Sequence, residues 1–123
     1  DLRDGSGNPV LPPDLKPLGV LWFGDELRAD AHRTLAEFRQ AGIQVKIISG
    51  DNPATVAALA KQAGLSDDIL AVSGQDLATM EEAVFTQTAV ESTIFGRITP
   101  EQKAHLVQSL QSRNHYVAMM GDG

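Results

Sequence analysis

The sequence predicts an α/β fold in which helices cross over between the strands of a parallel sheet. Short apolar runs alternate along the chain with amphipathic stretches of helical spacing, which is the pattern of strand–helix–strand units. Polar clusters follow three of these apolar runs, and the carboxyl ends of parallel strands meet at one edge of a sheet. With 123 residues, 42% of them hydrophobic, the chain suffices for one domain core.

Composition excludes several classes of function. The net charge of −6 argues against a nucleic-acid partner, because surfaces that bind a phosphate backbone are usually basic. The absence of cysteine excludes a disulfide framework and a thiolate metal site. No apolar run approaches the roughly 20 residues that a membrane-spanning helix needs.

The first third of the sequence predicts a linker, a strand and a helix. Residues 1–16 are rich in Gly, Asn and Pro and are predicted to be a linker, so the domain proper should cover residues 17–123. The apolar run 18–23 predicts a strand covered on both faces. Apolar residues at helical spacing then predict a helix that begins near Leu27 and ends at Gly42.

A strand, a turn and a second helix come next. The strand is predicted over residues 43–48. Asn52 is a predicted N-cap with Pro53 in the first helical position, and Gly64 should end that helix.

The second half of the chain continues the alternation. We predict a weaker strand over 69–72, a helix over 75–83, an unassigned connection, and a short strand over 93–95. Thr99 and Gln102 predict a capping box for a further helix, with Pro100 at its first position. Residues 116–120 predict a final strand.

The three polar clusters are residues 49–51 (Ser-Gly-Asp), 99–103 (Thr-Pro-Glu-Gln-Lys) and 121–123 (Gly-Asp-Gly). A small hydroxyl, a lysine and an aspartate are groups that phosphoryl transfer with magnesium requires. Lys103 precedes Leu106 by three residues, so it shares the helix face that packs on the sheet. Taken singly, each cluster has a simpler explanation. Residues 49–51 could be a turn with an acidic cap, Lys103 could be a rim lysine of which only the aliphatic stem is buried, and residues 121–123 could be an ordinary glycine-rich turn.

Residues 48–53 (Ile-Ser-Gly-Asp-Asn-Pro), 95–103 (Phe-Gly-Arg-Ile-Thr-Pro-Glu-Gln-Lys) and 117–123 (Val-Ala-Met-Met-Gly-Asp-Gly) together resemble the phosphorylation domain of P-type cation-transporting ATPases. That domain belongs to the haloacid dehalogenase-like superfamily. Residues 25–28 also match the family's Asp-x-x-Arg hinge, and the resemblance is closest to bacterial pumps for calcium or other cations. It implies a three-layer Rossmann-like fold.

The resemblance implies a role for each matching residue. Ser49 binds a phosphoryl oxygen, Lys103 neutralises charge on the phosphoryl group, and Asp122 ligates Mg²⁺. ATP is the implied substrate, and a membrane domain outside this chain carries the transported cation. The implied location is a cytoplasmic domain of an integral protein of the cell membrane, in contact with the other domains of the same transporter. The implied nucleotide-binding residues are Asp25, Arg28, Asp51 and Arg97.

The family's nucleophilic motif Asp-Lys-Thr-Gly is absent, and so is the Asn-Asp that follows Gly-Asp-Gly. Because the nucleophile lies on the family's central strand, the sheet should be incomplete here. We therefore interpret residues 17–123 as the C-terminal part of a phosphorylation domain and residues 1–16 as the exit from a nucleotide-binding domain. The chain alone is expected to be inactive.

Two alternatives stay open at this stage. A soluble magnesium-dependent phosphatase of the same superfamily would use the same serine, lysine and aspartate, but it would not need the hinge at residues 25–28. A non-catalytic binding domain that kept the fold would explain the missing nucleophile.

Overall fold

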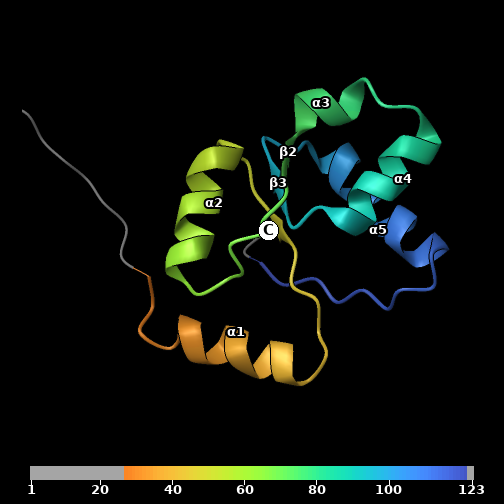
Figure 1. Cartoon of the computed structure of the whole chain (residues 1–123). Helices are drawn as coiled ribbons and strands as arrows, with labels where there is room; N and C mark the ends of the chain where they lie inside the picture. The colour runs from red at the N-terminus through yellow and green to blue at the C-terminus, as the bar shows by residue number, and fades with distance from the viewer. Residues whose placement is uncertain (1–26, 122–123) are drawn as a thin grey trace, which may run out of the picture.

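The sheet is small and parallel, and it has helices on both faces (Figure 1). The computed structural model describes residues 27–121. Within them the strands are β1 (Ile47–Ile48), β2 (Ala71–Ser73) and β3 (Ile94–Gly96), in the order β1-β3-β2. Both pairings are parallel, with Phe95 opposite Ile48 on one side and Val72 on the other. The predicted α/β class is confirmed.

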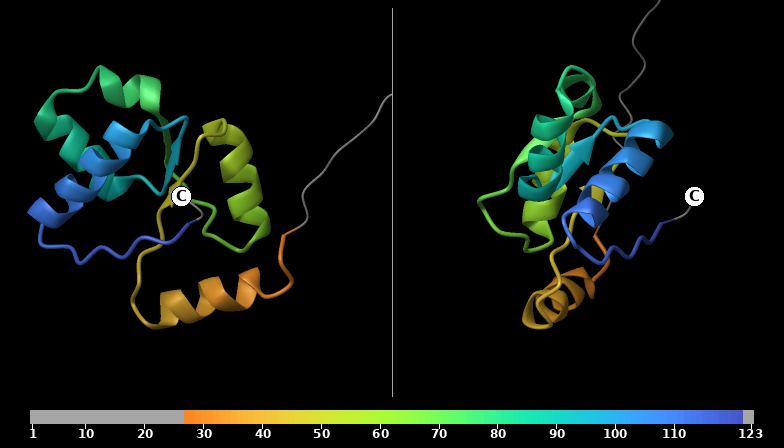
Figure 2. Two further views of the ribbon diagram at one scale, coloured as in Figure 1. Left: turned by 180° about the vertical axis from the view of Figure 1, so that it is seen from behind. Right: turned by 90° about the vertical axis from the view of Figure 1, so that its right-hand side faces the viewer.

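The two faces of the sheet are covered by different helices, as the left view in Figure 2 shows. Ile94 packs towards α2 (Pro53–Gln62). Phe95, the next residue, packs with α3 (Gly74–Ala78), α4 (Glu82–Glu91) and α5 (Pro100–Ser112). Successive side chains of a strand point to opposite faces, and therefore both residues can be buried, with exposures of 0% and 1%. The sheet is thus the middle of three layers.

Helices α1 (Ala31–Gln40) and α2 end as the sequence predicts. Gly42 and Gly64 follow these helices with φ of 74° and 90°, a backbone conformation that glycine adopts without strain. The side chain of Asn52 caps α2 by accepting from Ala54 N at 2.9 Å. The predicted cap and stops are confirmed.

The helix predicted over residues 75–83 is wrong as a single element. The structure has α3 (Gly74–Ala78) and α4 (Glu82–Glu91), the second of which fills the connection that sequence left unassigned. The break lies at Thr79, whose hydroxyl donates to Asp76 O at 2.9 Å, and Met80 then turns into the core. Helix α5 (Pro100–Ser112) begins with the predicted capping box.

Two predicted strands differ from the structure. Only Ile47–Ile48 of the run 43–48 is a strand, because the partner strand β3 begins at Ile94, opposite Ile47. Residues 116–120 are not a strand. Within the described range no strand flanks this segment, and β3 already has neighbours on both sides. Tyr116 and Met120 are accordingly 105% and 82% exposed.

Several predictions fall outside the described residues: the linker 1–16, the domain boundary near residue 17, and the strand 18–23. They stay predictions. Among residues 27–121, no helix combines the length and the apolar character that crossing a bilayer demands.

Lys46 joins α4 to the amino end of β1. Its ammonium donates to Val90 O at 2.7 Å and to Ser92 O at 2.6 Å, the carbonyls that end α4. Burial lowers the pKa of Lys46 below its ordinary value of 10.5. The lysine therefore satisfies helix-terminal carbonyls that the helix itself leaves without donors.

Replacing Lys46 by methionine is expected to lower the free energy of unfolding by about 1–2 kcal/mol, because both carbonyls lose their donor. Urea denaturation checks this, with Lys61→Met on the exposed surface of α2 as the matched control. Since the folded pKa is lowered, the unfolded chain binds the proton more tightly. The wild type should therefore gain stability over Lys46→Met as pH rises towards 10.5, and a flat difference would contradict this account.

Candidate functional site

The loops that follow β1 and β3 are joined by backbone hydrogen bonds at the carboxyl edge of the sheet. Ser49 N donates to Phe95 O at 2.9 Å, and Ile98 N donates back to Ser49 O at 3.2 Å. Arg97 N donates to Asp51 O at 3.0 Å. The structure thus brings together three of the predicted site residues, Ser49, Asp51 and Arg97, through their main chains.

The Ser49 hydroxyl lies at this edge, directly after β1. Its oxygen accepts from Asp51 N at 3.1 Å, which leaves the hydroxyl proton able to donate to a ligand oxygen. Ser49 is half-buried, whereas Gly50 and Asp51 are exposed. The turn therefore presents a fixed hydroxyl to solvent, next to a carboxylate.

Arg97 has a left-handed backbone with φ of 52°, which is uncommon for a residue other than glycine, and its side chain is exposed. Gly96, just before it, lies against Pro53 at the start of α2, and a Cβ there would come within 2.5 Å of Pro53 Cγ. The loop after β3 is therefore held closely against the first turn of α2. Backbone strain of this kind is typical of functional sites.

Lys103 is in the first turn of α5, directly after the same loop. It is half-buried, and its backbone N donates to Thr99 O at 2.9 Å. Leu106, one turn further, is 1% exposed and packs in the core. Lys103 therefore starts from the helix face that borders the sheet, at the edge where Ser49 lies.

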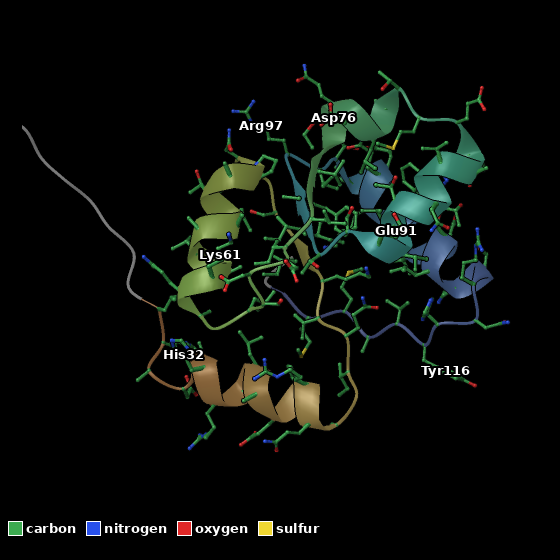
Figure 3. The ribbon with its side chains drawn as sticks, viewed as in Figure 1. His32, Lys61, Asp76, Glu91, Arg97 and Tyr116 are labelled. Atoms are coloured by element: carbon green, nitrogen blue, oxygen red, sulfur yellow. The ribbon has the colours of Figure 1, made fainter. Side chains whose placement is uncertain are left out.

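Of the remaining predicted residues, only Arg28 is among those that the structure describes, and it lies away from this edge. Arg28 precedes α1, and His32 of α1 lies against Gly64, beyond the far end of α2 (Figure 3). Arg97 is at the opposite end of that helix, whose ten residues span about 15 Å. Asp25 and Asp122 lie outside the described residues.

Sequence reasoning missed one contact at this edge. Gly74, at the end of β2, accepts from Gln102 Nε2 at 2.6 Å through its carbonyl. Gln102 was predicted only as part of a capping box, and nothing local to it indicates a partner 28 residues away. The polar pair Ser73-Gly74 after an apolar run was the available signal, because it marks a third strand end at the same edge.

A parallel sheet between helix layers, with hydroxyl, carboxylate and lysine at its carboxyl edge, offers groups that phosphoryl transfer uses at the place where such sheets bind ligands. The family model described as haloacid dehalogenase-like hydrolase matches residues 5–123. The chain belongs to this family.

Curated relatives specify the branch of the family. "Cation-transporting ATPase pma1" of Synechocystis sp. is 42% identical over 86% of this chain and 12% of its own length. "Probable cation-transporting ATPase F" of Mycobacterium tuberculosis is 37% identical over 97% of the chain and 14% of its own length. "Magnesium-transporting ATPase, P-type 1" of Salmonella typhimurium is 35% identical over 98% of the chain and 14% of its own length.

These relatives confirm the resemblance to P-type cation-transporting ATPases over nearly the whole chain. The chain spans between 12% and 14% of the length of the three relatives. Their transport activity is a property of proteins about seven times as long.

Proposed function

We propose that this chain is the C-terminal part of the phosphorylation domain of an ATP-driven, membrane-bound cation pump. One observation supports it above the others. The loops after β1 and β3 are hydrogen-bonded together, so that the Ser49 hydroxyl lies beside the loop that leads into Lys103. A phosphoryl group bound there accepts a hydrogen bond from Ser49, which follows β1, and lies near the positive charge of Lys103, which follows β3.

In this proposal each residue has a distinct task. The Ser49 hydroxyl donates to one oxygen of the phosphoryl group, and the Lys103 ammonium neutralises the charge that develops during transfer. Asp51, exposed beside Ser49, lies next to the phosphates of ATP, while Asp25, Arg28 and Arg97 meet the nucleotide from the hinge side. The acceptor is an aspartate carboxylate from another part of the protein, which becomes an acyl phosphate and is later hydrolysed.

Magnesium is the implied metal of this site. Mg²⁺ is usually bound through one or two carboxylates together with phosphate oxygens and waters. The donors at this edge are of that kind: hydroxyl and carboxylate oxygens, without cysteine in the chain. Asp122 is the residue proposed to hold the ion, which neutralises phosphate charge when bound.

The remaining elements of the proposal concern the whole protein. ATP is its substrate, the transported cation passes through a membrane domain, and this chain is a cytoplasmic domain in contact with the other domains of the transporter. Similarity to three cation-transporting ATPases over 86–98% of the chain supports this placement.

The coding sequence on both sides of this segment tests the proposal directly. An upstream Asp-Lys-Thr-Gly, separated by a nucleotide-binding domain and accompanied by several long apolar spans, is the expected result. A nearby Asp-x-Asp without apolar spans would instead indicate a soluble phosphatase. The absence of both motifs from the flanking sequence would indicate a non-catalytic binding domain.

The chain by itself is expected to hydrolyse no ATP, because it lacks the Asp-Lys-Thr-Gly nucleophile. Phosphate release from Mg²⁺ and ATP by the purified chain is the measurement, with Asp122→Ala as the control for contaminating activity. Turnover that Asp122→Ala abolishes would contradict the proposed division of the site between this chain and the rest of the protein.

A further inference from the structure

The loops that end β2 and β3 are in direct main-chain contact at Gly74. Gly74 is buried, and a Cβ built on it would lie closer to Arg97 O than any real carbon–oxygen contact, and 2.6 Å from Gln102 Oε1. Only a residue without a side chain lets these two backbones approach so closely. Gly74 is thus required by the arrangement of the loops around it.

Gln102 uses both ends of its amide to hold this arrangement. Its Oε1 accepts from Thr99 N at 3.1 Å within the capping box, and its Nε2 donates to Gly74 O at 2.6 Å. Thr99 Oγ1 in turn accepts from Gln102 N at 3.2 Å. An amide can accept and donate at once, whereas a carboxylate, the other common group at this capping position, can only accept.

Two hydrogen bonds and one packing contact link the ends of the three strands. Asp51 O accepts from Arg97 N, the Arg97 carbonyl packs on Gly74, and the Gly74 carbonyl accepts from Gln102. Lys103 follows Gln102 in the first turn of α5. The contacts of Gln102 therefore fix the position of the turn from which the Lys103 side chain extends. An isolated first turn frays readily, because its N–H groups have no partners within the helix.

We propose that Gln102 and Gly74 are positioning residues, which fix the first turn of α5 so that the Lys103 ammonium meets the phosphoryl group. This inference rests on the proposed function. A displacement of about 1 Å in a catalytic group can cost about 10²-fold in rate. The effect should fall on the chemical step, since neither residue contacts the nucleotide in this account.

Gln102→Glu in the full-length protein tests the proposal, because it keeps the acceptor for Thr99 N but cannot donate to Gly74 O when ionised. We expect the rate of enzyme phosphorylation by ATP to fall about 10- to 100-fold, with the KM for ATP changed less than about twofold. Gln108→Glu, an exposed position of the same helix, is the charge-matched control and should stay within about twofold of the wild type.

A pH profile supplies a readout that a purely structural role would not move. Protonation of the introduced carboxyl restores a donor, so the rate of Gln102→Glu relative to Gln108→Glu should recover as pH falls towards about 4.3, the ordinary pKa of a glutamate. Gly74→Ala should reduce the rate at least as much and show no recovery in acid, because its defect is steric.

Each outcome decides one point. A wild-type protein that forms no phosphorylated intermediate would overturn the proposed function, and the positioning role with it. A phosphorylating wild type, with Gln102→Glu equal to Gln108→Glu, would overturn the positioning role alone. A rise in the KM for ATP that accounts for the whole loss of kcat/KM would also overturn the positioning role, since it would place Gln102 in nucleotide binding.

Discussion

Replacing Lys103 by alanine is expected to slow formation of the phosphorylated intermediate about 10²- to 10³-fold, a cost like that of losing one preorganised hydrogen-bond donor at a reacting group. Lys103 begins on the helix face that borders the sheet, next to the loop bonded to Ser49 and Asp51. Lys103 is the one lysine at this edge among residues 27–121. No second lysine of the described chain can therefore supply the charge that the substitution removes.

Rapid-quench phosphorylation of the full-length protein measures this effect. Lys61→Ala, at an exposed position on α2, removes the same charge elsewhere and should leave the rate within about twofold. Thermal unfolding of both variants separates a lost charge from a lost fold. If Lys103→Ala phosphorylated as fast as Lys61→Ala, Lys103 would be only a partly buried structural lysine.

Gly96→Ala is expected to destabilise the chain by about 1–3 kcal/mol, because the added methyl group overpacks the contact between β3 and α2. Its Cβ would lie 2.5 Å from Pro53 Cγ and 2.6 Å from Pro53 N, and the proline backbone cannot move aside as a flexible side chain can. The loops that carry Ser49 and Arg97 would separate with it.

Chemical denaturation of the 123-residue chain measures this cost. Gly50→Ala is the control, since a Cβ on Gly50 meets nothing within 4 Å and the residue belongs to the loop hydrogen-bonded to that of Gly96. Its stability should stay within about 0.5 kcal/mol of the wild type. Equal stability of the two variants would show that the loops are looser than this packing indicates.

Local signals predicted helix ends well. Asn52 and Pro53 start α2, Thr99 and Gln102 form the capping box of α5, and Gly42 follows α1 with positive φ. In each case the sequence determines the structure within one turn, because the cap bonds to backbone two or three residues away. The same locality makes the order of elements predictable.

Strand ends were predicted less well because a strand depends on its neighbour. Residues 116–120 are as apolar as the real strands, and residues 43–46 alternate apolar and polar side chains as a strand can, but neither segment pairs with β3. Sequence periodicity reports burial and spacing, not the presence of a partner strand. The split between α3 and α4 was missed for a related reason, since it follows from Met80 packing into a core formed by distant residues.

The candidate site was predictable in composition but not in geometry. Ser49 and Lys103 could be chosen because each follows a predicted strand. The backbone bond between Arg97 and Asp51, and the contact of Gly74 with Gln102, join residues 46 and 28 positions apart and leave no local pattern.

Acid-quench labelling of the full-length protein with γ-labelled ATP, followed by hydroxylamine, tests directly whether this chain belongs to a pump that is phosphorylated by ATP. We expect a Mg²⁺-dependent label on the protein that hydroxylamine removes, as expected of an aspartyl phosphate, and that Lys103→Ala strongly reduces. No label, or a label that resists hydroxylamine, would contradict the assignment of this chain to the phosphorylation domain of a cation pump.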